Sequence, residues 1–189
     1  MLNDPVVVLP ENCTDIFADA RSFTTDDRMF DRLDTSHTKN MNRMFYSSDL
    51  QAIDTTHLNL RSLTNATEMF RDCTSLNSID LGGFKEAAYL SDIQGLFYGC
   101  TKLTNISLTG INTSGVSRLD NLFRDCSKLT TIHLEECDFS KVTSVDSIFR
   151  DCPELTTIYV DPGTDWVAQG IGTAGSTNNI FNNDTKLRN

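Results

Sequence analysis

The sequence predicts an α/β solenoid, in which units of about 26 residues stack into one elongated domain. Three observations predict it. A phenylalanine recurs along the chain, four consecutive units repeat the same residue types at fixed offsets from it, and each unit joins a helix-like pattern of apolar residues to a strand-like one. At 189 residues, the chain is long enough for one domain with a substantial core.

The repeat is anchored by a phenylalanine that returns after 28, 25, 27, 26, 26 and 32 residues. In the four most regular units, a cysteine follows the anchor by three residues, a leucine by six, an isoleucine by nine, and a leucine or valine by eleven. Agreement at five positions in four consecutive units indicates a repeat architecture. The seven anchors are Phe17, Phe45, Phe70, Phe97, Phe123, Phe149 and Phe181.

The outer units follow the pattern less closely. Phe45 is followed by Ser48 where the regular units have cysteine, and the later apolar pair is shifted by a one-residue deletion. After Phe17, polar residues replace that apolar pair. Phe30 resembles a further anchor, but Phe45 follows it by only 15 residues, which is too short for a coil. We therefore interpret Phe30 as a decoy or as part of an insertion.

Each regular unit contains two elements. Val142, Val145, Phe149 and Cys152 are spaced by three, four and three residues, as on one face of an α-helix. The two preceding units repeat this spacing. After the anchor, the pattern L-x-x-I-x-L alternates over its last residues, which is typical of a short, half-buried strand. The predicted unit is therefore helix, tight turn, strand and loop.

Stacking such units predicts a curved shape. Neighbouring strands lie about 4.8 Å apart, whereas packed helices need roughly 10 Å each. We therefore expect a leucine-rich-repeat-type horseshoe with a parallel sheet on its concave face and helices on its convex face.

The chain is expected to form a single solenoid domain over residues 1–189. Residues 1–35 would form an N-terminal cap and a first degenerate repeat, residues 36–160 the regular repeats, and residues 161–189 a C-terminal cap. Trp166 is expected to cover the open edge of the sheet, and a functional aromatic platform is the alternative. A truncated chain is the alternative to a natural cap.

The charge of the chain excludes some partners. A formal net charge of −10 argues against nucleic acid and against anionic membranes. No stretch approaches the roughly 20 apolar residues of a membrane span, so we expect no direct membrane insertion. The apolar run at residues 6–9 follows no basic segment and does not resemble a signal peptide.

The cysteines are expected to be structural. Four of them occur once per repeat on the apolar face of the predicted helix, and the chain has no C-x-x-C pair of the kind that binds zinc. Helices spaced at roughly 10 Å would also keep the thiols too far apart for disulfides. Cys137 lies outside this column and is the better candidate for a reactive thiol.

No pattern for catalysis, a cofactor or a metal is found. His37, His57 and His133 are far apart, and no nucleophile motif, phosphate loop or metalloprotease motif is present. The acidic cluster at residues 135–138 does not match a calcium-loop spacing, so a solvated loop is favoured over a calcium site. The sequence therefore predicts a protein that is not an enzyme.

The repeats resemble a known family at residues that can be quoted directly. "MFRDCTSLNSIDL", "LFYGCTKLTNISL", "LFRDCSKLTTIHL" and "IFRDCPELTTIYV" are similar to the bacterial surface-protein repeat of the BspA-like branch of leucine-rich repeats. The resemblance covers roughly residues 9–187. It implies cell-surface proteins that bind host proteins, matrix or other cells, and related repeats also occur in phage and protist proteins. It does not specify a ligand.

The concave face is the candidate binding surface. In each strand, the residues on either side of the inward isoleucine point outward, and they vary between units while the scaffold positions hold. A merely solvated face is the alternative to a binding surface. Tyr159 and His133 are the best single contacts, because aromatic residues carry much of the energy of interfaces. One column is Asp54, Asp80, Ser107, His133 and Tyr159, and the other is Ala52, Ser78, Asn105, Thr131 and Thr157.

Two functions follow as hypotheses. The first is an acidic, extracellular or surface-displayed module for adhesion or recognition, whose partner is a protein or a glycan. The alternative is a structural assembly protein, for example a component of a virion or a surface layer, which uses the same solenoid as a scaffold. Nothing in the sequence predicts an oligomeric state.

Overall fold

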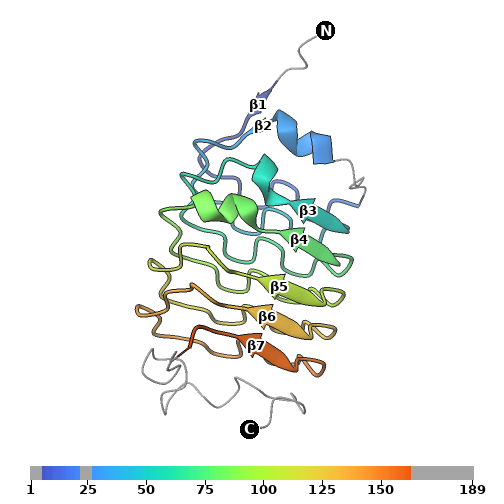
Figure 1. Cartoon of the computed structure of the whole chain (residues 1–189). Helices are drawn as coiled ribbons and strands as arrows, with labels where there is room; N and C mark the ends of the chain where they lie inside the picture. Colours follow the sequence, from blue (N-terminus) through green and yellow to red (C-terminus); the bar gives the residue numbers. More distant parts are fainter. Residues whose placement is uncertain (1–5, 22–26, 163–189) are drawn as a thin grey trace.

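The computed structural model describes residues 6–21 and 27–162, which form a stack of successive coils (Figure 1). Each coil carries a short strand on one side of the stack and a run of turns around its phenylalanine on the opposite side. We call the side made by the outward residues of β3 to β7 the strand face. We call the opposite side, made by the turns around the phenylalanines, the turn face. In the part of the chain that is described, no helix is long and apolar enough to cross a membrane.

The strand face is built from parallel three-residue strands in chain order, as the sequence predicts. Their isoleucines are in register, with Ile53 opposite Ile79 and Ile132 between Ile106 and Ile158. A separate two-stranded pair, β1 (Val7–Val8) with β2 (Leu33–Asp34), lies in the first coils. The strands of the strand face are β3 (Ala52–Asp54), β4 (Ser78–Asp80), β5 (Asn105–Ser107), β6 (Thr131–His133) and β7 (Thr157–Tyr159).

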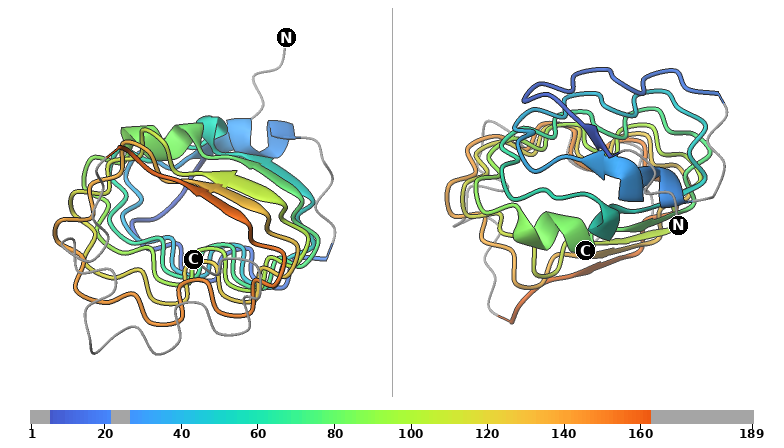
Figure 2. Two further views of the ribbon diagram at one scale, coloured as in Figure 1. Left: turned by 60° about the horizontal axis from the view of Figure 1, so that its bottom comes forward. Right: turned by 90° about the horizontal axis from the view of Figure 1, so that it is seen from above.

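Among the described residues, three 3₁₀ helices distinguish the first coils from the later ones. They are η1 (Asp27–Arg32), η2 (Thr55–His57) and η3 (Gly82–Glu86), and they lie side by side along one edge of the stack (Figure 2). Phe30 of η1 is buried, and its ring packs edge-on against Phe45 with the ring centroids 5.7 Å apart. Phe30 therefore joins the core beside the stacked anchors without being one of them, as its spacing from Phe45 indicates.

The predicted helices before each phenylalanine are absent from the described residues. The residues two before and two after the anchor have left-handed backbone conformations, for example Glu68 (φ 54°) and Asp72 (φ 58°) around Phe70. A right-handed helix cannot continue through such residues. The same pair of left-handed positions flanks the anchors at Phe17, Phe45, Phe97, Phe123 and Phe149.

Consecutive turns take the place of the helix. Around Phe45, the N–H of Met44 donates to the carbonyl of Met41 within a turn (3.1 Å), whereas the N–H of Phe45 donates to Met69 of the next coil (2.9 Å). Each turn spans four residues, and a new one begins at every second residue, at Met41, Arg43 and Phe45. This segment buries Met41, Met44, Phe45 and Ser48. This spacing of three, one and three is also that of a helix face, so the apolar pattern could not separate the two structures.

The curvature expected from helices is also absent. Since the turn face is joined from coil to coil by backbone hydrogen bonds, such as Arg43 N–H to Thr67 O (2.9 Å), its coils lie as close together as strands do. Without a layer of helices spaced at roughly 10 Å, no difference in width forces a horseshoe. The coils accordingly stack almost in line in Figure 1.

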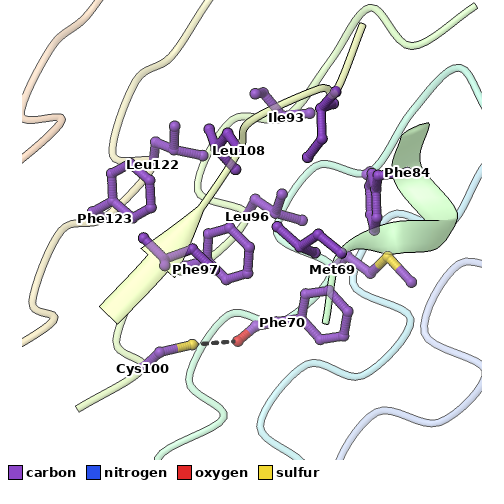
Figure 3. Close-up of a cluster of buried hydrophobic side chains, with 14 of the residues drawn as sticks. Met69, Phe70, Phe84, Ile93, Leu96, Phe97, Cys100, Leu108, Leu122 and Phe123 are labelled. Atoms are coloured by element: carbon purple, nitrogen blue, oxygen red, sulfur yellow. Dashed lines mark hydrogen bonds between the residues drawn. The ribbon is translucent and has the colours of Figure 1, made fainter. Parts of the chain in front are cut away.

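The core is organised around a column of stacked phenylalanine rings (Figure 3). From Phe17 to Phe149, consecutive ring centroids lie 5.5–5.9 Å apart, and the planes differ by 13° or less. Every ring except that of Phe17 is buried. The predicted anchor Phe181, Trp166 and nearly all of the predicted C-terminal cap lie outside the described residues.

Candidate functional site

The strand face presents the predicted outward residues side by side. Strand register places Asp54 beside Asp80, and it places His133 between Ser107 and Tyr159. The other column is arranged in the same way. Four of the predicted residues on β4 and β5 are exposed, as is Tyr159, and the remaining ones are half-buried. The exposed four are Ser78, Asp80, Asn105 and Ser107, and the half-buried ones are Ala52, Asp54, Thr131, His133 and Thr157.

An aromatic pair marks the C-terminal half of the strand face. The rings of His133 and Tyr159 are stacked, with centroids 4.5 Å apart and planes 14° apart, and 48% of Tyr159 is exposed. The carboxylate of Glu135 lies 3.1 Å from Nδ1 of His133. A hydrogen bond from its own backbone N–H, together with the contact to His133, lowers the pKa of Glu135 below its ordinary value. The pair is therefore fixed from one side and accessible from the other.

A polar cluster marks the N-terminal half. His57 bridges two carboxylates, with Nδ1 facing Asp31 and Nε2 lying 3.6 Å from Asp54. Burial raises the pKa of Asp54, but hydrogen bonds from the Thr56 hydroxyl and N–H outweigh it, so the net shift is downward. His57 and His133 thus lie at different ends of the face.

The two columns are interrupted where the sheet is open. Strand β4 pairs with β3, and β5 pairs with β6, which pairs in turn with β7, but β4 and β5 belong to separate sheets. We call the cavity of about 300 Å³ between them the β4–β5 opening. A shallow hollow of similar volume adjoins it over β3 and β4. The opening is lined by Ile79, Asp80, Leu81, Gly82, Lys85, Asn105, Ile106, Ser107 and Thr109.

Sequence reasoning missed this opening. Two signals pointed to it: the 27-residue gap between Phe70 and Phe97, which is one residue longer than the next two, and the adjacent glycines Gly82 and Gly83 directly after the strand. Glycine pairs at a strand end indicate that the backbone turns or approaches another segment closely. The periodicity of the apolar residues carries no such information.

The column of cysteines has the predicted structural role. Each thiol donates a hydrogen bond to the phenylalanine carbonyl of the preceding coil, as Cys126 does to Phe97 (3.0 Å) and Cys152 to Phe123 (2.9 Å). The cysteines of the described residues are free thiols. The argument against disulfides from helix spacing was nevertheless wrong, because the described coils contain no such helices.

Cys137 does not fit the role of a reactive thiol. Its side chain is half-buried, and Sγ lies 3.6 Å from the carbonyl oxygen of Leu108. Burial raises the pKa of Cys137 to about 12. Because the thiolate is the reactive form, this environment suppresses the reactivity that the sequence suggested.

The chemistry available on the strand face is that of contact and hydrogen bonding. Within residues 6–21 and 27–162, no group of three or more histidine, cysteine, aspartate or glutamate side chains is arranged to hold a metal ion. The face offers carboxylates, hydroxyls, one amide and the stacked aromatic pair. These groups can bind a polar ligand.

Comparison with known proteins identifies the repeat family. A sequence model described as "BspA type Leucine rich repeat region" matches six copies within residues 7–110 and 38–169. The crystal structure of a leucine rich cell surface protein from Faecalibacterium prausnitzii A2-165 is 19% identical over 90% of this chain, with a TM-score of 0.49, and the match spans 36% of that protein. A comparison with curated proteins gave no match. Because the repeat region covers most of the sequence, the chain belongs to the BspA-type leucine-rich repeat family.

Proposed function

We propose that the protein is a non-catalytic interaction module that is displayed at a cell surface and recognises a protein or a glycan through its strand face. Membership in the BspA-type family supports this class of function. Surface display is the location that the family resemblance implies. Adhesion to another cell or to matrix is the corresponding role.

The stacked pair of His133 and Tyr159 is the observation that carries the proposal. Its ring faces offer an aromatic surface, and the stacking and the Glu135 contact hold it in one orientation. A side chain that is already ordered loses little conformational entropy on binding. Aromatic groups of this kind dominate the energy of many interfaces. Thr131 and Thr157 add hydroxyl groups on the same strands.

The distribution of sequence variation within the repeats also supports a binding role. Scaffold positions keep phenylalanine, cysteine, leucine and isoleucine from coil to coil. The outward positions change from carboxylate at Asp54 and Asp80 to hydroxyl at Ser107 and to aromatic at His133 and Tyr159. Variation on one face of a rigid frame is typical of a recognition surface.

The test is a screen of the recombinant chain against matrix proteins and a glycan array. Any partner found is then measured against a His133→Ala/Tyr159→Ala variant. The matched control is Tyr46→Ala/Tyr98→Ala, which removes two half-buried tyrosines from the turn face. We expect the first variant to bind at least about tenfold more weakly and the control less than about twofold. Equal affinity of both variants would contradict the proposal.

A further inference from the structure

The two sides of the β4–β5 opening carry backbone groups that other coils use to join their strands. The N–H of Leu108 donates to His133 (2.9 Å), and the N–H of Leu134 donates to Tyr159 (2.9 Å). Leu81 is the equivalent residue at the opening. Among the described residues, its N–H has no backbone acceptor on β5.

The same difference is found at the other end of the strands. The N–H of Thr130 donates to Thr104 (2.8 Å), and that of Asn77 donates to Gln51 (2.9 Å). Thr104 is the residue of β5's coil that corresponds to Thr130 and Asn77. Within the described coils, its N–H makes no hydrogen bond to the carbonyl of Asn77. Both ends of the β4–β5 opening therefore have unused main-chain hydrogen-bonding groups.

The opening has a structural cause in the packing of η3. The N–H of Gly83 donates to the Thr55 hydroxyl (3.1 Å), and that hydroxyl donates to the carbonyl of Asp80 (2.8 Å). A Cβ atom at Gly83 would lie 2.0 Å from the carbonyl oxygen of Thr55, so the two backbones are in close contact. These contacts hold the end of β4 against the preceding coil and away from β5. The opening is therefore a property of the fold at the last 3₁₀ helix.

Among the described residues that line the opening, Lys85 is the one cation. The side chain of Lys85 extends from η3 to Gly110 in the next coil, where a Cβ atom would lie 3.4 Å from Nζ. Lys85 forms no ion pair with a residue that the structure describes. The carboxylate of Asp80, at the end of β4 just before η3, accepts the N–H of Gly82 (2.8 Å) and forms no ion pair with Lys85. The rim thus offers an ammonium group without a carboxylate partner.

We propose that the β4–β5 opening binds an extended peptide segment of a partner protein, which bonds to the free strand edges and places a carboxylate at Lys85. The inference deepens the proposed function by naming the ligand class of part of the same face. Addition of a strand is the mode in which main-chain groups give affinity and side chains give specificity. A volume of about 300 Å³ lies at the lower end of ligand pockets and suits a short stretch of chain.

An extended peptide fits this site better than a glycan does. A peptide supplies N–H and C=O groups along its length, which matches the unused groups near Leu81 and Thr104. Ile79 and Ile106 line the opening, and the half-buried Ile79 offers a contact for an apolar side chain. The aromatic pair that would stack on a sugar lies on β6 and β7, outside the residues that line the opening.

The test begins with a phage-displayed library of random heptapeptides selected against the full chain. Enriched peptides are expected to share an aspartate or glutamate at one position. The affinity of synthetic copies is then measured for the Lys85→Glu variant and for the control Lys128→Glu. The control makes the same charge change at an exposed site two coils away from η3. We expect at least about tenfold weaker binding for the first and less than about twofold change for the second.

Amide hydrogen exchange supplies a readout that does not depend on Lys85. The peptide is expected to slow exchange at Leu81 and Thr104 at least about tenfold, and a copy with N-methylated backbone is expected to lose binding. Failure to enrich any peptide, equal affinity for the two lysine variants, or unchanged exchange at both amides would overturn the inference. His133→Ala/Tyr159→Ala should bind the peptide normally, so failure here is distinct from failure of the proposed function.

Discussion

The thiol of Cys100 donates a hydrogen bond to the carbonyl oxygen of Phe70 in the preceding coil, across 3.2 Å (Figure 3). The same carbonyl accepts the N–H of Cys73 in its own coil (3.2 Å). One oxygen therefore closes a turn and joins two coils at once. Because the column repeats this arrangement, the cysteines both fill space and align consecutive repeats.

Substitutions at Cys100 should separate these two roles. Cys100→Ser keeps a donor, and Ser48 shows that the column accepts a hydroxyl. Cys100→Ala removes the donor and leaves a small void, so we expect it to lower the free energy of unfolding by about 1–2 kcal/mol, more than the serine variant does. Urea denaturation measures both, with exposed Lys102→Ala as the control. A serine variant less stable than the alanine variant would contradict the role of the hydrogen bond.

The phenylalanine column should be most sensitive at its centre. Phe97 is fully buried and stacks on Phe70 (5.9 Å) and Phe123 (5.8 Å). Phe97→Leu should cost about 1–3 kcal/mol, because it loses both ring contacts and part of the buried area. Phe17→Leu should cost less, since Phe17 is half-buried. Equal shifts of the two denaturation midpoints would argue against a column centred on the buried rings.

The contact between η2 and η3 should not tolerate a methyl group. In Gly83→Ala, the new Cβ would meet the Thr55 backbone oxygen, which cannot move without moving its coil. We expect a loss of about 2 kcal/mol or more. Gly82→Ala is the matched control, because its nearest neighbour is a side-chain atom of Thr56 (2.6 Å). Thermal denaturation compares the two, and a Gly83→Ala protein as stable as the control would contradict the account of the opening.

The buried thiols predict how stability changes at alkaline pH. Burial raises the pKa of Cys73 to about 11 and that of Cys126 to about 12. The stability that these raised values contribute is present below the ordinary thiol pKa of 9.0 and is lost as the pH rises from there toward 12. Urea midpoints should therefore fall over this range, and Cys126→Ser should reduce the fall. A Cys126→Ser protein with an unchanged alkaline fall would contradict this assignment.

The sequence predicted the strands accurately because their signal is local and unambiguous. Ile79, Ile106 and Ile132 recur at a fixed offset from their anchors, and an alternating pattern around an inward residue leaves only one register for a parallel stack. The outward columns followed directly from this register. The binding role of those columns stays a prediction.

The turn face could not be derived from the apolar pattern alone. Buried residues at Met41, Met44, Phe45 and Ser48 fit a helix and a run of four-residue turns equally well. The distinguishing signal lies in the polar residues, since aspartate and glycine recur two residues after the anchor, as at Asp72 and Gly99. These residue types tolerate left-handed backbone conformations, which a helix does not contain.

The strand face as the recognition surface is the central claim, and hydrogen–deuterium exchange of a complex tests it most directly. A partner found in the screen is added to the full chain, and protection is mapped by peptide. The account predicts slower exchange in the segments that contain β3 to β7, and unchanged exchange around Tyr46, Arg71 and Tyr98 on the turn face. Protection confined to the turn face, with β6 and β7 unaffected, would contradict it.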